Sequence, residues 1–365
     1  MRPTYLEVNL SQLRKNLEAI RAQVAPAKIM LMVKANAYGH GVDGVAPFIE
    51  PYVDYLGVAI VEEGIHLREL GIRKPILVAG ATIAEQVPLF AEFDLTLTGS
   101  SLGLLDVAEE VSRSTGSRIK THLKVDTGME RVGVREYEAE SFILKSSAYS
   151  HMLIEGIYTH FANSERADRA YSNMQLERFQ EVLELYQKHS LPIPALRHVC
   201  NSGGILNLPD AYFDMVRPGV MFYGVYPGDE VDRVVEVKPA LTWRSHVAFS
   251  KRTLPGRPIS YGSLWQAEVE TRIVTIPCGY GDGYFRRMTN RAQVLIHQKK
   301  YPQVGTICMD QFMVNVGDDD IKVGDEVILL GEGIRAEDLA QWMGTNEYEV
   351  MTNISARVPR VYVND

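Results

Sequence analysis

The chain contains few cysteines and no long hydrophobic run, and both absences narrow what it can be. Its 365 residues include three cysteines, too few and too scattered for a disulfide framework: Cys200, Cys278 and Cys308. No apolar run approaches the length that spans a membrane, and the N-terminal segment lacks the apolar core of a signal peptide. We therefore expect a cytoplasmic protein with no membrane partner.

The chain also lacks an excess of positive charge and any metal-ligand spacing. It carries 38 Lys and Arg against 46 Asp and Glu, which gives a formal net charge of -8. Nucleic-acid binding needs a basic face for the phosphates, so no nucleic-acid partner is expected. Cys308-Met309-Asp310 has no CxxC or paired histidines beside it, so no metal site is expected either.

Short apolar runs alternate with amphipathic stretches over the first two-thirds of the chain. The runs are nearly continuous, which is typical of parallel strands buried on both faces. Eight of them fit an α/β fold with a (β/α)8 barrel of the TIM type. A doubly wound sheet would also alternate, but no GxGxxG follows the first run. The predicted strands cover residues 28–33, 55–60, 75–79, 94–97, 120–125, 154–159, 196–200 and 213–216.

The pattern changes after about Pro239, where apolar runs follow one another with turns between them. A mostly β domain is therefore expected there, with a helix only near residues 336–342. We predict a barrel domain over residues 1–238 and a C-terminal β domain over residues 239–365. The predicted strands of the second domain cover residues 241–252, 271–277, 293–297, 312–316 and 326–330.

Barrel enzymes carry their sites at the carboxyl ends of the strands, often with a phosphate site after the seventh and eighth. Lys34 follows the first predicted strand, where burial lowers its pKa and suits it to Schiff-base or base chemistry. After the seventh strand, the segment 201–204 offers N–H groups and a hydroxyl to a phosphate. The polar and loop residues that follow predicted strands are Tyr38, Arg131, His160, Asn201, Ser202, Arg217, Gly219 and Val220.

The segment Val33-Lys34-Ala35-Asn36-Ala37-Tyr38-Gly39-His40-Gly41 resembles the cofactor-lysine motif of alanine racemases, which use pyridoxal phosphate (PLP). Three further matches lie in the predicted β domain: Ser260-Tyr261-Gly262, Gly279-Tyr280-Gly281-Asp282-Gly283 and Cys308-Met309-Asp310. The resemblance covers nearly the whole chain. It implies a PLP-dependent isomerase of fold type III that works as a homodimer.

The resemblance implies specific cofactor contacts in the barrel. Lys34 would carry PLP, and the residues after the seventh and eighth strands, with Tyr38, would hold its phosphate. Arg217 would face the pyridine nitrogen and keep it unprotonated, which makes the cofactor a weaker electron sink and limits transamination. The implied phosphate contacts are Tyr38, Ser202, Gly219 and Val220, with Asn201 beside them.

Three more barrel residues match positions that surround the PLP ring in alanine racemases. His160 would hydrogen-bond Arg217. Arg131 would contact the phenolic oxygen of PLP and take part in substrate binding. Lys124 matches a lysine that is often carbamylated in relatives and orients that arginine.

The β domain would supply the second half of the site from the other subunit. Racemisation removes a proton from one face of Cα and returns one to the other, so two bases are needed. The resemblance implies Lys34 for the D enantiomer and Tyr261 for the L. Because a free phenol has a pKa of about 10, Tyr261 would need help from His160 and Arg217. Substrate contacts would come from Tyr280, Met309 and Asp310.

The expected reaction is therefore the interconversion of L- and D-alanine, which supplies D-alanine for peptidoglycan. One alternative is a racemase of broader or different specificity, such as serine. A basic amino-acid decarboxylase is disfavoured by Arg217, because those enzymes place an acidic residue there. A small PLP-binding protein of cofactor homeostasis would lack residues 239–365. Ala356 departs from several members, which place a phosphate-contacting tyrosine at that position.

Overall fold

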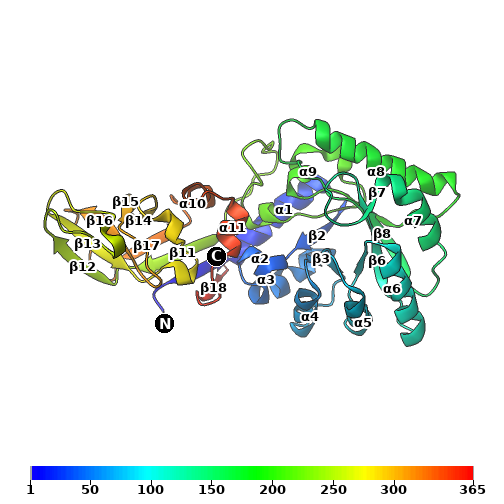
Figure 1. The fold of residues 1–365 in the computed structure, drawn as a ribbon, viewed down its shortest axis with the longest axis horizontal. Helices are drawn as coiled ribbons and strands as arrows, with labels where there is room; N and C mark the ends of the chain where they lie inside the picture. Colours follow the sequence, from blue (N-terminus) through cyan, green and yellow to red (C-terminus); the bar gives the residue numbers. More distant parts are fainter. Residues whose placement is uncertain (1, 365) are drawn as a thin grey trace. The chain divides into compact units, whose positions relative to one another are not determined.

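The computed structural model describes residues 2–364, which divide into two compact units (Figure 1). The barrel unit contains Arg14–Ala37 and Val42–Val237. The β unit contains the N-terminal residues up to Leu13, Tyr38–Gly41 and the chain from Lys238 onward. No helix within the described residues is long and apolar enough to cross a membrane.

Within residues 14–237, eight parallel strands close into a barrel. Two sheets, ordered β10-β2-β3-β4 and β5-β6-β8-β9, account for them. A bridge from Leu77 to Thr96 joins β4 to β5, and Arg217 N donates to Cys200 O at 2.9 Å between β10 and β9. The strands are β2 (Lys28–Met32), β3 (Tyr55–Val58), β4 (Ile76–Val78), β5 (Leu97–Gly99), β6 (Lys120–Asp126), β8 (Leu153–Tyr158), β9 (Leu196–His198) and β10 (Met215–Val216). The predicted barrel is confirmed.

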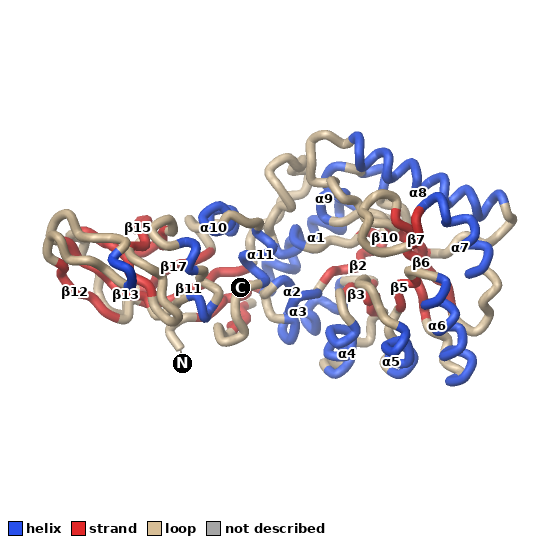
Figure 2. Tube along the Cα trace, in the orientation of Figure 1, coloured by secondary structure: helices blue, strands red, loops and turns tan. Residues whose placement is uncertain are grey.

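Helices surround these strands (Figure 2). Helix α6 shows why they form: the Ser101 hydroxyl accepts from Leu104 N at its start, and Gly116 with φ 74° ends it. Its residues Leu104, Leu105 and Ala108 are buried, at the spacing of one helix face. The helices of the barrel unit are α1 (Leu10–Val24) from Arg14 onward, α3 (Val42–Ile49), α4 (Val61–Glu69), α5 (Val87–Glu92), α6 (Leu102–Thr115), α7 (Ala139–Ser146), α8 (Ala170–Lys188) and α9 (Ser202–Asn207).

The β unit is built on a nine-stranded sheet in the order β12-β13-β16-β15-β14-β17-β11-β1-β18. Strand β11 alternates between buried and half-buried residues, the period-2 pattern of a strand with one face on a core. The strands are β1 (Tyr5–Asn9), β11 (Leu241–His246), β12 (Phe249–Thr253), β13 (Thr271–Ile276), β14 (Gln293–Ile296), β15 (Lys299–Val304), β16 (Phe312–Gly317), β17 (Glu326–Leu330) and β18 (Arg360–Val363). Two helices, α10 (Ala336–Met343) and α11 (Glu347–Thr352), accompany them.

The β unit differs from the sequence prediction in the number of its strands and in where they begin and end. The predicted strand 241–252 is two strands, because the chain turns between β11 and β12 and each pairs with a different neighbour. Strand β1 pairs with β11 and β18, so it belongs to this sheet, whereas the sequence-based division placed it with the barrel. The alternation of apolar Leu6 and Val8 with polar Glu7 and Asn9 was a usable signal in the sequence, and the structure buries the two apolar residues. Helix α11 and strands β15 and β18 were also missed.

Candidate functional site

Lys34 stands at the carboxyl end of β2, a central barrel strand whose neighbours are β10 and β3. Burial lowers the pKa of this lysine below its ordinary value, and the charges of Arg131 and Arg217 lower it further, while Glu63 raises it. An amine with a lowered pKa is more often uncharged near neutral pH, which is the form that attacks a carbonyl or takes a proton.

The backbone after Lys34 makes a left-handed turn. The short segment α2 (Lys34–Tyr38) is not a right-handed helix, because Ala35, Asn36, Ala37 and Tyr38 have φ of 51°, 56°, 52° and 50°. Left-handed backbone costs a residue with a Cβ roughly 1–2 kcal/mol. Fixed contacts hold the turn: Glu63 Oε1 accepts from Ala35 N at 2.6 Å. A strained turn kept in place directly after a strand-end lysine is typical of a functional site.

The next residues, Tyr38–Gly41, are held by the C-terminal part of the β unit. Arg360 donates from Nε and Nη2 to Gly39 O at 3.1 and 3.0 Å. The Tyr362 hydroxyl donates to Gly41 O at 3.1 Å, and the rings of Tyr38 and Tyr348 lie 6.2 Å apart. The loop that carries Tyr38 is therefore fixed on its C-terminal side.

Arg217, at the end of β10, is buried among acceptors. Its Nη2 donates to Thr159 O and Val199 O, both at 2.8 Å. The same nitrogen lies 3.1 Å from His160 Nδ1, and Nη1 lies 2.7 Å from His198 Nδ1. Burial lowers the pKa of Arg217 to about 10, so the guanidinium stays cationic at neutral pH. The structure thus places His160 within hydrogen-bond distance of Arg217, as the resemblance implies.

A line of buried polar groups continues from Arg217 down the barrel, and sequence reasoning missed it. His198 Nε2 lies 2.8 Å from His122 Nδ1, and His122 Nε2 lies 3.3 Å from Glu155 Oε1. Glu155 also accepts from the Tyr55 hydroxyl. Histidine inside a strand that is otherwise buried was the signal that could have found His122 and His198.

The loops after β8, β9 and β10 meet at Ser202, the first residue of α9. Its Oγ accepts from Gly219 N at 3.0 Å and from Met221 N at 3.4 Å. Asn201 caps α9 instead: its side-chain oxygen accepts from Gly204 N at 3.0 Å and from the Ser164 hydroxyl. Val220 is buried beside this junction. The cluster offers a hydroxyl and backbone N–H groups of the kind that bind phosphate.

Lys124 lies inside the barrel on β6 without a carboxylate. Its Nζ stands 4.8 Å from the centre of the Tyr158 ring, and no carboxylate of the described residues is within salt-bridge distance. Burial holds the pKa of Lys124 well below its ordinary value, with Arg217 lowering it further. The lowered pKa favours the uncharged form of the amine, which is the nucleophilic form.

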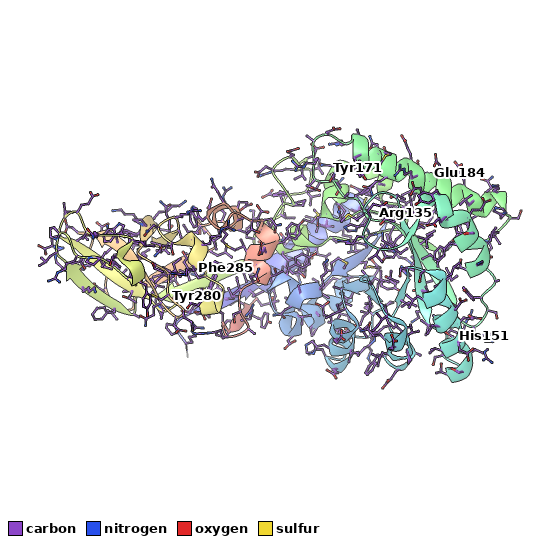
Figure 3. The ribbon with its side chains drawn as sticks, in the orientation of Figure 1. Arg135, His151, Tyr171, Glu184, Tyr280 and Phe285 are labelled. Carbon is purple, nitrogen blue, oxygen red and sulfur yellow. The ribbon has the colours of Figure 1, made fainter. Side chains whose placement is uncertain are left out.

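Arg131 lies past β6 in a loop folded around one carboxylate. Asp126 accepts the backbone N–H groups of residues 128–131 at 2.8–3.1 Å. The Arg131 side chain is exposed and lines a recess of about 400 Å³. Arg135 (Figure 3) lines it as well, as do Glu130, Glu138 and Ser100. The recess lies over the carboxyl ends of the barrel strands β5 and β6.

The other predicted residues belong to the β unit, where three turns meet (Figure 3 labels Tyr280). Tyr280 N donates to Cys308 O at 3.0 Å, and the Thr306 hydroxyl donates to Tyr261 O at 2.6 Å. Tyr261 is 72% exposed and Met309 52%. These side chains are exposed on the unit and do not pack in its core, and Asp310 lies beside Met309 in the sequence.

The described residues contain no group of three or more His, Cys, Asp or Glu that could hold a metal ion. The donors in the barrel unit are an amine, a guanidinium, a hydroxyl and imidazoles. That set suits an anionic organic cofactor with an aldehyde better than it suits a cation.

Comparison with known proteins gives one consistent result. Family models described as alanine racemase, N-terminal domain, and alanine racemase, C-terminal domain, match residues 8–227 and 240–362. "Alanine racemase 2" of Caldanaerobacter subterraneus is 40% identical and covers 100% of this chain and 95% of its own. The alanine racemase of Carboxydothermus hydrogenoformans is 41% identical, with 100% of each chain covered.

Solved structures agree. An alanine racemase of Clostridium difficile superposes with a TM-score of 0.96 at 38% identity, covering 100% of this chain and 97% of its own. The alanine racemase of Bartonella henselae, whose structure contains covalently bound pyridoxal phosphate, gives 0.91 at 27% identity with both chains fully covered (100% each). The likeness extends over both units.

Proposed function

The chain belongs to the alanine racemase family, and from that premise we propose that it interconverts L- and D-alanine with PLP as cofactor. The observation that carries the proposal is Lys34, a half-buried amine of lowered pKa at the end of a barrel strand. Arg217 directly follows β10, and Ser202 lies in the segment that follows the neighbouring strand β9. A racemase of broader or different specificity, such as serine, is the second candidate.

The residues present fit PLP. Lys34 supplies an amine for the aldehyde. Ser202 Oγ already accepts two backbone N–H groups, which leaves its own O–H to donate to a phosphate oxygen. Gly219, Val220 and Tyr38 complete the proposed phosphate contacts, with Asn201 shaping the turn through its cap. When bound, PLP supplies an electron-withdrawing ring that acidifies the Cα–H of an attached amino acid.

Arg217 would face the ring nitrogen. Four acceptors fix its guanidinium, and with a pKa of about 10 it remains charged at neutral pH. A fixed cation there disfavours protonation of the ring nitrogen. With PLP bound, an unprotonated ring nitrogen would make the ring a weaker electron sink, which would favour return of the proton to Cα over transamination.

Two residues would move the proton. Lys34 would act on the D enantiomer, and the partner subunit's copy of Tyr261 would act on the L enantiomer from the opposite face. His160 supports the tyrosine: its Nδ1 accepts from Arg217, so its Nε2 carries the hydrogen that can stabilise a phenolate. Burial keeps His160 neutral by holding its pKa well below the ordinary value.

Exposure in the β unit supports a homodimer with shared sites. Tyr261, Leu264, Tyr280 and Met309 are each more than 40% exposed, although large apolar and aromatic side chains gain from burial. We propose that a second copy covers them with the mouth of its barrel. Met309 N–H, Tyr280, Asp310 and Arg131 would then contact the substrate.

Lys124 is proposed as a carbamylated lysine that orients Arg131. The buried, uncharged amine is the reactive form toward CO2, and the negative carbamate would offset the nearby charges of Arg131 and Arg217. A role in supplying D-alanine for peptidoglycan, and a cytoplasmic location, stay predictions from the sequence.

Chiral chromatography of a mixed L-amino-acid pool tests the reaction. After incubation with PLP-loaded protein, D-alanine alone is the expected product. Several D-amino acids would replace the substrate with a broader class while keeping the two bases. Loaded protein that yields no D product would exclude racemisation and favour decarboxylation or simple PLP binding.

A further inference from the structure

Four side chains of alternating charge form a ladder in the β unit. Arg2 Nη2 lies 2.6 Å from Asp282 Oδ2. Asp282 Oδ1 lies 2.9 Å from Arg357 Nε, and Arg357 Nη2 lies 2.7 Å from Asp310 Oδ1. Two cations and two anions balance, so the ladder carries no net charge.

The inner end of the ladder is buried and the outer end is exposed. The Asp282 side chain is 0% exposed. A buried carboxylate is costly unless it is paired and hydrogen-bonded. Asp282 Oδ2 accepts hydrogen bonds from Arg2 Nη2 and from Gly279 N at 3.1 Å, whereas Oδ1 has no hydrogen bond from the described residues and is compensated by its ion pair with Arg357. Asp310 is 59% exposed at the other end. Arg357 therefore links a rigid interior anchor to a surface carboxylate.

Arg357 also stands where three turns meet. Gly281 N donates to Met309 O at 2.9 Å, and Ser355 N donates to Asp282 O at 3.0 Å. A Cβ on Gly281 would lie 2.8 Å from Arg357 Nη1, so glycine there lets the guanidinium lie against the backbone. Losing Arg357 would release the turn 308–310 from its tie to Asp282.

We propose that Arg357 is a positioning residue for the substrate carboxylate. It holds Asp310, fixes the peptide of Met309 next to it, and cancels the negative charge that Asp310 would otherwise present to an incoming carboxylate. The proposal rests on the proposed function, because it assumes that Met309 N–H receives the carboxylate of an amino acid.

A positioning role and a merely structural role of Arg357 differ in their effect on substrate binding. With Arg357 replaced by a neutral residue, Asp310 becomes an unpaired anion beside the site of an anionic substrate group. Repulsion then weakens substrate binding more than it slows proton transfer, so KM rises and kcat changes less. Removing the Asp310 charge in the same variant recovers part of the affinity.

Arg357→Met is compared with Arg2→Met, because both remove one cation from Asp282 but only the first frees Asp310. KM for both alanine enantiomers is expected to rise roughly tenfold in Arg357→Met and less than about twofold in Arg2→Met. The double variant Arg357→Met/Asp310→Asn is expected to regain at least about half of that loss on a logarithmic scale. Arg357→Lys, which keeps the charge, should lie between wild type and Arg357→Met.

Two results would overturn the positioning role: an equal KM increase in Arg2→Met, or a double variant no better than Arg357→Met. Thermal unfolding of each variant shows whether it is folded. If Arg357→Met does not fold, Arg357→Lys takes its place in the comparison with Arg2→Met. The wild-type protein is assayed first. Absence of racemisation in wild type defeats the proposed function, whereas racemisation with an unchanged KM in Arg357→Met defeats only the role of Arg357.

Discussion

Nη1 of Arg217 lies 2.7 Å from Nδ1 of His198, and this contact sets the protons of a buried line of side chains. A guanidinium only donates, so His198 Nδ1 must accept. His198 Nε2 then carries the hydrogen and donates to His122 Nδ1, and His122 Nε2 donates to Glu155. Both imidazoles are neutral, which agrees with the lowering of their pKa values by burial.

Removing the acceptor at His198 should destabilise the protein. In His198→Leu the buried guanidinium loses one of its four acceptors, at a cost of about 1–3 kcal/mol. His198→Asn is the matched control, because its amide oxygen can occupy the place of Nδ1. Urea unfolding measures the free energy of unfolding of both variants, and the visible absorbance of bound PLP reports any change around Arg217. An equal loss in the two variants would show that packing, and not the acceptor, matters there.

Acid should weaken folding through the buried histidines. The pKa values of His122, His160 and His198 are lowered in the folded state, so the unfolded chain binds more protons below about pH 6.5. The contribution of these histidines to the free energy of unfolding is fully present above that pH. It falls as the pH drops, by at most about 1.4 kcal/mol per pH unit for each histidine.

Urea unfolding between pH 7.5 and 5, expressed as stability against pH, tests this expectation. His198→Asn should reduce the slope of this curve by the contribution of one titrating histidine. His297→Asn changes an exposed histidine and is the control. A curve with the same slope in His198→Asn as in wild type would contradict the neutral buried imidazole.

Mixing two inactive variants tests the shared site. Lys34→Ala and Tyr261→Phe proteins should each be nearly inactive. If the lysine of one subunit works with the tyrosine of the other, each mixed dimer has one intact site and one doubly altered site. Random exchange makes half of the dimers mixed, which restores roughly a quarter of wild-type activity. A site built from one subunit would give no recovery on mixing, because each site would keep one defect.

Lys124 should respond to CO2. In its free form it is an amine whose pKa burial lowers, which favours the uncharged form, and carbamylation would convert it into an anion near the charges of Arg217 and Arg131. Native mass spectrometry in bicarbonate buffer should show the mass of one added CO2, and unfolding should need more urea than in CO2-free buffer. Lys124→Met should lose both effects.

The control for that experiment is Lys120→Met on the same strand. Lys120 pairs with Asp94 at 2.9 Å near the surface, so both effects should persist when it is replaced. Added mass that survived in Lys124→Met would place the modification elsewhere.

The sequence revealed what is local and missed what depends on pairing across the fold. The strand-end positions of Lys34, His160 and Arg217 followed from apolar runs and the barrel rule. The line through His122 to Glu155 could not be read, because its members come from different strands and meet only when the barrel closes. The ladder from Arg2 to Asp310 was hidden for the same reason: its ends are about 300 residues apart in sequence.

The left-handed turn after Lys34 should reverse the usual destabilising effect of a glycine substitution. Ala35 has φ 51° and ψ 52°, where its Cβ costs roughly 1–2 kcal/mol. Ala35→Gly relieves that strain and should raise stability, or leave it unchanged once the entropy of the unfolded glycine is counted. The matched control is Ala22→Gly, an exposed position in right-handed α1, which should lose about 0.5–1 kcal/mol. Equal losses at both positions in urea unfolding would mean that the turn is not left-handed in solution.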